Sequence, residues 1–252
     1  MTLRAPCLFS LVLLLIASPL LADDATTRPL QHIRVDIKAK KIYVDCEALN
    51  VDIPLEFFCV ADGGNEYESV LRTPAKPSDI HFALLMLGLK PGAPATFDPD
   101  HQRWLPPYGA PVDIACQFMK NGKQITVPAC EMMRSIKTHK EMPQSVWVFD
   151  GSRIMPDGVY AADVTGYVVS ICNFDLTMID VPSLVSNSND TLEWEFNPAV
   201  VPPRLTPVTM IISPATPSEV AKMPRNKGLP VADFNPGPGL SGAGSTPATQ
   251  PN

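Results

Sequence analysis

The sequence predicts an α+β fold: a single β-rich domain with a mostly antiparallel sheet and one main buried helix, at about 77–88, packed on it. Three observations predict this. Several segments alternate apolar and polar residues, as half-buried strands do. An Asn-Gly pair between two such segments is typical of a tight β-hairpin. One stretch has apolar residues at helical spacing, bounded by proline and glycine.

Alternation is clearest near the start of the predicted domain. The segment "HIRVDIK" puts Ile33, Val35 and Ile37 on one face of a strand. The segment "KIYVDCEA" (41–48) repeats the pattern. "LEFFCVA" (55–61) is instead a continuous apolar run, which favours a central strand with both faces buried.

The hairpin is predicted at Asn121-Gly122, because a type I′ turn needs positive φ at both central residues. A two-residue loop there pairs Phe118 with Ile125 and Cys116 with Val127, which puts the apolar side chains on one face. Later segments also read as strands. They are 145–150, 159–172, 191–196 and 206–213.

The predicted helix has Pro77 in its first turn, with Lys76 or Ser78 as the cap, and Gly88 as a left-handed stop. Its helical stripe consists of Ile80, Ala83, Leu84 and Leu87. Further apolar groups on its other sides are Phe82, Leu85 and Met86. A helix that is apolar nearly all round is expected to be buried on more than one face.

Both ends of the chain differ from the middle. Residues 1–22 have one basic residue, an apolar run and a small residue at the end, as a cleavable signal peptide does. The alternative is a membrane anchor, but the run falls short of the ~20 residues that a spanning helix needs. Residues 214–252 contain 8 prolines and 5 glycines, which predicts a disordered tail. The folded unit is then 28–213, in a protein exported to the periplasm or cell envelope.

Composition argues against several classes of function. The net charge is −6 and no basic stripe is present, so neither nucleic acid nor an anionic membrane is an expected partner. Beyond the signal peptide no segment is long and apolar enough to span a membrane. The G-x-S-x-G and phosphate-loop motifs are missing. We expect no catalytic motif of these kinds, no metal and no cofactor.

The cysteines support the same expectation. The five beyond residue 22 contain no C-x-x-C pair, which argues against zinc and iron–sulfur sites. An oxidising compartment would permit disulfides, but the odd number leaves at least one thiol unpaired. We favour their role as small core residues on strands. They are Cys46, Cys59, Cys116, Cys130 and Cys172.

Two long segments carry a family resemblance. "LEFFCVADGGNEYESVLRTPAKPSDIHFALLMLGLKPG" (55–92) and the run from "WVFDGSRIMPDG" to "TPVTMIISP" (147–214) resemble the YdjY-domain family, and the similarity covers most of 33–214. That family consists largely of exported bacterial proteins without an assigned activity. The resemblance implies one domain and export, and it supplies no catalytic residue. Relatives often read His-Glu-Ser where this chain has Tyr67-Glu68-Ser69, and tyrosine weakens the idea of a metal pair with His81.

Polar loops give the candidate binding residues, because sites often lie on loops held by a rigid sheet. One set lies beside the predicted helix and the other precedes the 191–196 strand. The candidates are Glu66, Glu68, Ser69 and His81 in the first set, and Asn187, Asn189, Asp190 and Trp194 in the second. A solvated turn, a core tryptophan and a structural histidine are the competing explanations. Near Trp194 the ligand would be a sugar or a peptide.

Three hypotheses of function follow. The first is a non-enzymatic envelope domain that binds a protein partner or a small molecule. The second is a metal-dependent or acid–base enzyme that uses Glu68, Ser69 and His81. The third is a structural part of an envelope assembly, tethered by its proline-rich tail. An enzyme should gather the three side chains in one pocket, whereas a binding or structural domain should leave them apart.

Overall fold

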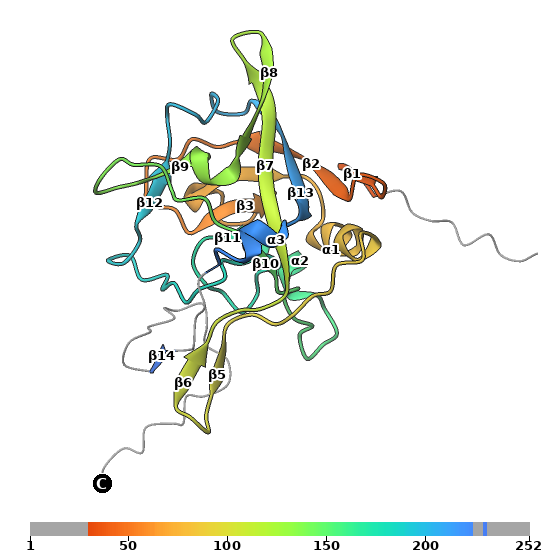
Figure 1. Ribbon diagram of the computed structural model, residues 1–252, viewed down its shortest axis with the longest axis vertical. Coiled ribbons are helices and arrows are strands. Elements are labelled where there is room, and N and C mark those ends of the chain that lie inside the picture. Colours follow the sequence, from red (N-terminus) through yellow and green to blue (C-terminus); the bar gives the residue numbers. More distant parts are fainter. Residues whose placement is uncertain (1–29, 224–228, 231–252) are drawn as a thin grey trace, which may run out of the picture.

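The computed structural model describes residues 30–223 and 229–230 (Figure 1). The predicted signal peptide at 1–22 and most of the predicted tail lie outside the described residues. The fold is α+β and mostly β, as the sequence predicts.

A curved nine-stranded sheet is the framework (Figure 1). Its order is β10–β7–β13–β2–β4–β3–β11, with β1 beside β2 and β8 beside β7. All of these pairs are antiparallel except β3 with β4. The strands are β1 (Ile33–Asp36), β2 (Lys41–Ala48), β3 (Phe57–Ala61), β4 (Ser69–Thr73), β7 (Ala110–Lys120), β8 (Lys123–Pro128), β10 (Trp147–Phe149), β11 (Tyr167–Ser170) and β13 (Pro207–Pro214).

A short closing segment, residues 178–181, joins the two ends of this sheet. On one side Val148 of β10 and Asp180 exchange backbone hydrogen bonds of 2.9 and 3.0 Å. On the other side the Ile179 N–H donates to the Val168 carbonyl of β11 at 3.0 Å. Both end strands therefore find a backbone partner, and the sheet closes on itself.

The interior of the closed sheet is apolar. Alternate side chains of β2 are buried, as the period-two pattern predicts. Within the predicted range 55–61 the strand β3 covers Phe57–Ala61, and it is buried with a neighbouring strand on each side, as expected of a central strand. The largest fully buried side chains include Trp147, Phe57, Phe58, Phe149, Ile42, Leu71 and Ile114.

The predicted hairpin is confirmed in its turn and its register. Asn121 and Gly122 have φ of 52° and 73°, and β7 and β8 pair around them. Phe118 lies opposite Ile125 and Cys116 lies opposite Val127. The pairing continues to Ala115 and Pro128.

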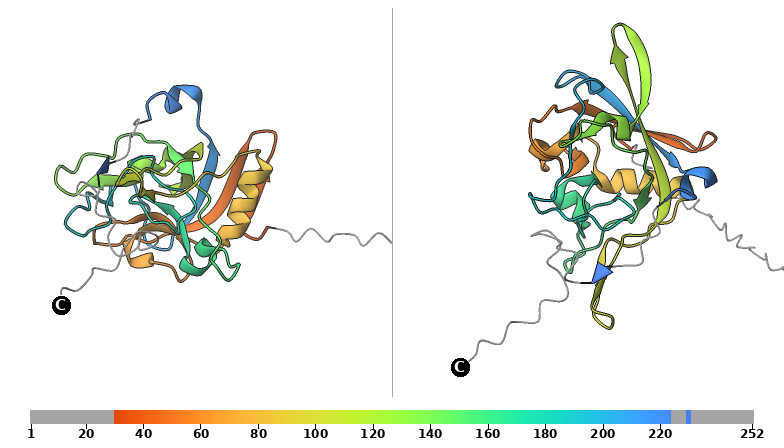
Figure 2. Two further views of the ribbon diagram at one scale, coloured as in Figure 1. Left: turned by 90° about the horizontal axis from the view of Figure 1, so that it is seen from below. Right: turned by 60° about the vertical axis from the view of Figure 1, so that its left-hand side comes forward.

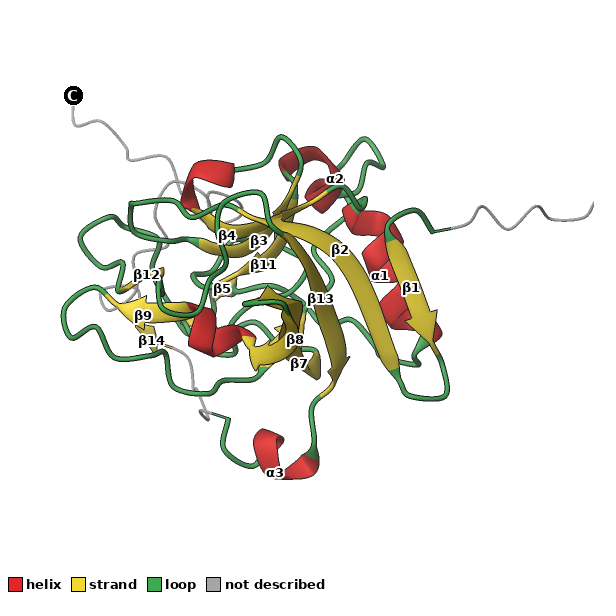
Figure 3. Cartoon of the chain, turned by 90° about the horizontal axis from the view of Figure 1, so that it is seen from above, coloured by secondary structure: helices red, strands yellow, loops and turns green. Residues whose placement is uncertain are grey.

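Helix α1 (Pro77–Met86) packs one face against β1 and β2 (Figure 3). Lys76 is the N-cap residue, and Gly88 takes the predicted left-handed conformation with φ 82°. The expected burial on several faces is wrong. Phe82, Leu85 and Met86 are 55%, 41% and 44% exposed, because only one face of the helix meets the sheet.

Two strand predictions are corrected. The stretch 159–172 is interrupted by helix α2 (Ala161–Thr165), so that only β11 remains as strand. The Asp163 carboxylate accepts a hydrogen bond from the Ser78 N–H at 2.8 Å, which ties α2 to the start of α1. Ile37 is exposed because β1 ends at Asp36 and the chain turns there.

Smaller elements surround the sheet. A β5–β6 hairpin points away from it, as Figure 2 shows, and β14 pairs with β6. A separate pair joins β9 and β12. These elements are β5 (Thr96–Asp98), β6 (Arg103–Leu105), β9 (Met133–Ser135), β12 (Trp194–Phe196) and β14 (Leu229–Pro230), with 3-10 turns at Glu66–Glu68 and Ala129–Met132.

The predicted disordered tail begins with ordered structure. Strand β13 continues to Pro214, and helix α3 (Pro217–Val220) follows. Thr216 and Glu219 form a reciprocal capping box at the start of α3. Regular structure thus extends past the boundary predicted at 214, and the later part of the tail lies outside the described residues.

We predict that Gly109→Ala lowers the free energy of unfolding by about 2 kcal/mol or more. A Cβ at this position would collide with the backbone carbonyl of Phe149, at the pairing of β7 with β10. Urea unfolding followed by circular dichroism measures the change. Gly122→Ala is the control, because its Cβ meets no atom within 4 Å and the cost is confined to about 1 kcal/mol for its positive φ. Equal losses in the two variants would contradict the prediction.

Candidate functional site

The structure separates the three side chains of the enzyme hypothesis. Ser69 begins β4 and is fully buried. Its hydroxyl donates to the Leu71 carbonyl at 2.7 Å, so it serves the local backbone. His81 lines a groove on α1, and neither Glu68 nor Ser69 lines that groove.

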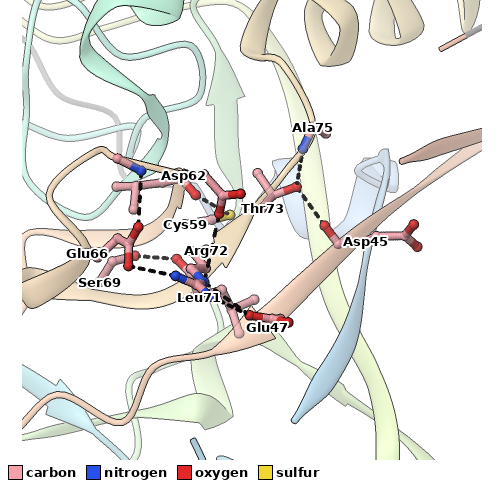
Figure 4. Close-up of polar contacts among 12 residues, drawn as sticks. Asp45, Glu47, Cys59, Asp62, Glu66, Ser69, Leu71, Arg72, Thr73 and Ala75 are labelled. Atoms are coloured by element: carbon pink, nitrogen blue, oxygen red, sulfur yellow. Dashed lines mark hydrogen bonds and ion pairs between the residues drawn. The ribbon is translucent and has the colours of Figure 1, made fainter. Parts of the chain in front are cut away.

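Glu66 belongs to an ion-pair cluster centred on Arg72 (Figure 4). The Arg72 guanidinium lies 3.1 Å from Glu66 and 2.8 Å from Glu47, with Asp62 at 3.8 Å. The other Glu66 oxygen accepts a hydrogen bond from the Gly63 N–H at 3.1 Å. These contacts fix the loop before β4 onto β2, which is a structural role.

Glu68 lies beside a carboxyl group that the sequence analysis did not select. Burial, and then the hydrogen bond and charge of Glu68, raise the pKa of Glu56 to about 8. Glu56 therefore keeps its proton at neutral pH. The signal for Glu56 was present, since it is the only charged residue in the apolar run 55–61.

Of the candidates before and within the 191–196 strand, two are exposed to solvent and two are buried or half-buried. Asn189 and Asp190 are exposed on a turn. Asn187 is buried, and its Oδ1 has no hydrogen-bond partner among the described residues. Trp194 is half-buried and lines a groove of about 550 Å³. We call it the Trp194 groove.

Two irregular segments and β12 form the Trp194 groove. One wall runs from Met142 into β10, and the other is the chain that follows the closing segment. Trp194 is fixed by its pairing with Ser135 of β9 and by a 2.8 Å hydrogen bond from the Leu55 N–H to its carbonyl. Apolar lining residues include Leu55, Met142, Trp147, Leu184, Leu192 and Trp194.

Unpaired polar groups lie among these apolar walls. The buried Trp147 indole N–H has no partner within residues 30–223. In the same part of the chain, the backbone groups of Ser183 and Leu184 form no hydrogen bond. Their neighbour Val185 is held on both backbone groups by Asn173, at 2.7 and 3.0 Å. The wall is thus anchored while part of its backbone stays available to a ligand.

A scan against family models matches residues 33–213 to the YdjY domain. The chain belongs to the YdjY domain family. The resemblance read from 55–92 and 147–214 is confirmed by this match. Neither a curated protein nor a solved structure is detectably similar to the chain.

The described part of this YdjY domain has neither a metal-binding cluster nor a membrane-spanning helix. Within the described ranges, no three His, Cys, Asp or Glu side chains are grouped so as to hold a metal ion. No helix there has the length and apolar character to cross a bilayer. The five cysteines are all buried free thiols, which confirms their placement in the core. Burial raises the pKa of Cys59, Cys116 and Cys172 well above the ordinary thiol value.

Where the closing segment of the YdjY domain meets the end of β10, two carboxyls are buried that no sequence motif marks. Asp150 and Asp180 are fully buried. One Asp180 oxygen accepts from the Ser170 hydroxyl at 3.1 Å and from the Val181 N–H at 2.7 Å, while the other has no partner in the described chain. Burial raises the pKa of Asp180 to about 8, and burial and the Asp180 charge raise the pKa of Asp150.

This pair predicts a stability that falls as pH rises. Between about pH 4 and 8 the folded protein retains a proton on Asp180 that the unfolded chain has released. The slope is up to about 1.4 kcal/mol per pH unit for one such proton. Asp180→Asn is neutral at every pH, so we expect its free energy of unfolding to fall less steeply over this window.

Urea unfolding at several pH values between 4.5 and 8 measures both slopes. Asp190→Asn is the control, because that residue is exposed on a turn and its replacement should leave the slope unchanged. Parallel profiles for wild type and Asp180→Asn would refute the assignment of a retained proton.

Proposed function

We propose that this protein is an exported, non-enzymatic binding domain of the cell envelope, and that the Trp194 groove receives an extended segment of a partner polypeptide. The observation that carries the proposal is the lining of that groove. Apolar side chains and Trp194 lie beside unpaired backbone groups at Ser183 and Leu184. An extended peptide satisfies both, because its backbone pairs with an open strand-like edge and its alternate side chains enter apolar pockets.

The lining favours a peptide over a sugar. A sugar site needs several side-chain donors and acceptors around an aromatic face, and this groove offers mostly aliphatic and aromatic groups. Its polar side chains are small hydroxyls, with Gln144 and Glu193 at the edges and both exposed.

Two further points support the proposal. The separation of Ser69 from His81 favours a binding domain over an acid–base enzyme, which would need those groups in one pocket. Export is supported by the sequence of residues 1–22, which has the order of charged, apolar and small residues of a signal peptide.

The test is selection of random heptapeptides displayed on phage against the purified protein, followed by calorimetry with the selected peptides. We expect Trp194→Ala to weaken their binding about 10- to 30-fold, as loss of a central tryptophan does in other interfaces. Leu184→Ser, on the opposite wall, should weaken it as well. Trp104→Ala is the matched control, because Trp104 lies on the β5–β6 hairpin outside the groove.

Several results would overturn the proposal. One is that no heptapeptide is enriched. Another is that selected peptides bind Trp194→Ala as tightly as wild type. Binding of cellohexaose at Trp194, without any peptide binding, would replace the peptide by a sugar. Circular dichroism of each variant checks that the fold is retained.

A further inference from the structure

A second groove lies between α1 and the 151–160 loop, and the proposed function does not use it. Its volume is about 470 Å³, within the range of roughly 300–1,000 Å³ that is usual for small-molecule sites. It shares no lining residue with the Trp194 groove. We call it the His81 groove. Its lining includes His81, Phe82, Leu85, Gly151, Ile154 and Tyr160.

The walls of the His81 groove are apolar and open to solvent. Phe82 and Leu85 are two of the three α1 side chains that were expected to be buried and are not. Ile154, across the groove, is 63% exposed. Three large apolar side chains exposed around one hollow form the kind of patch that marks a binding site in a soluble domain.

We assign the tautomer of the histidine from its hydrogen bonds. The Tyr160 hydroxyl lies 3.1 Å from the Gly151 carbonyl, which can only accept, so the single hydroxyl proton is donated there. His81 Nδ1 lies 2.9 Å from the same hydroxyl oxygen, which must then accept. Nδ1 therefore carries a proton, and the neutral ring presents a lone pair on Nε2.

The environment keeps this arrangement near neutral pH. Burial lowers the pKa of His81, so the ring is neutral at pH 7. Burial raises the pKa of Tyr160, so the phenol keeps its proton. Nε2 has no hydrogen-bond partner in the described part of the chain. At the rim, Arg153 is paired with Asp175 at 2.9 Å, which offsets its charge.

We propose that the His81 groove is a second binding site, for a small neutral amphiphile that lays an apolar body against Phe82, Leu85 and Ile154 and donates a hydrogen bond from an O–H or N–H to His81 Nε2. The apolar walls select the body of the ligand. The lone pair on His81 Nε2 selects a donor at the polar end of the ligand, because a ligand acceptor there would face the Nε2 acceptor.

Two probes test this choice: 4-propylphenol and its methyl ether, 4-propylanisole, which differ chiefly in the O–H donor. Each is titrated at pH 7 into the ¹⁵N-labelled full-length protein. We expect the phenol to shift the amide resonances of Phe82, Leu85 and Ile154, and the ether to bind about tenfold more weakly, as loss of one hydrogen bond to a desolvated acceptor does.

Variants test whether His81 causes the preference for the phenol over the ether. His81→Phe should abolish the difference between the two probes, and Phe82→Ser should weaken both, with little risk to folding because Phe82 is exposed. His139→Phe, an exposed histidine outside the groove, should change neither. Equal affinities of phenol and ether for wild type would overturn the proposal, as would shifts confined to another part of the protein. Either result leaves the peptide site at Trp194 untouched, because the two grooves share no residue.

Discussion

The structure depends on the backbone pairing that closes the sheet. Residues 178–181 bond to β10 on one side and to β11 on the other, so two strands far apart in the sheet order share one short partner. Both grooves are attached to this closure. One wall of the Trp194 groove is the chain that leaves the closing segment at Val181. One wall of the His81 groove is the loop that leaves β10 at Asp150.

Two buried polar side chains, Asp150 and Asp180, lie where the sheet closes. The Asp180 carboxylate accepts hydrogen bonds from the Ser170 hydroxyl and the Val181 N–H. These bonds fix the path of the chain into the Trp194 groove. Asp150 accepts a hydrogen bond from the Ser152 N–H at 3.3 Å, at the start of the His81 groove wall. Two buried carboxyls in apolar surroundings oppose folding as soon as they ionise. Their retained protons are therefore part of the closed structure.

Local rules explain what the sequence predicts well. The Asn121-Gly122 turn and the alternation of β2 each depend on residues close in the chain, and both are confirmed. The boundaries of α1 follow in the same way from Pro77 and Gly88. Such features are set by backbone sterics and by burial on one face.

Features that depend on distant neighbours were missed. Phe82 has the same apolar character as a core residue, and only the lack of a covering element leaves it exposed. The strand predicted at 159–172 gives way to α2, which is tied to α1 through Asp163. Asp150 and Asp180 show no motif, because their meeting is made by the closure itself. Trp194 could be selected as a candidate because an aromatic residue beside a polar loop is a local signal, and the structure places it in the lining of a groove.

The buried thiols have a consequence for how opening of this domain can be followed. Cys46, Cys59 and Cys116 lie on three strands of the closed sheet, and none of them is accessible in the folded state. A thiol reagent can reach them only when the strands part, because all three side chains are buried. Burial also raises the pKa of Cys59 and Cys116, which suppresses the reactive thiolate at those two positions. Under native conditions the labelling rate of each cysteine therefore measures how often its strand opens, locally or with the whole domain. Comparing the labelling rates of the three cysteines shows whether their strands open together or separately, without any added probe.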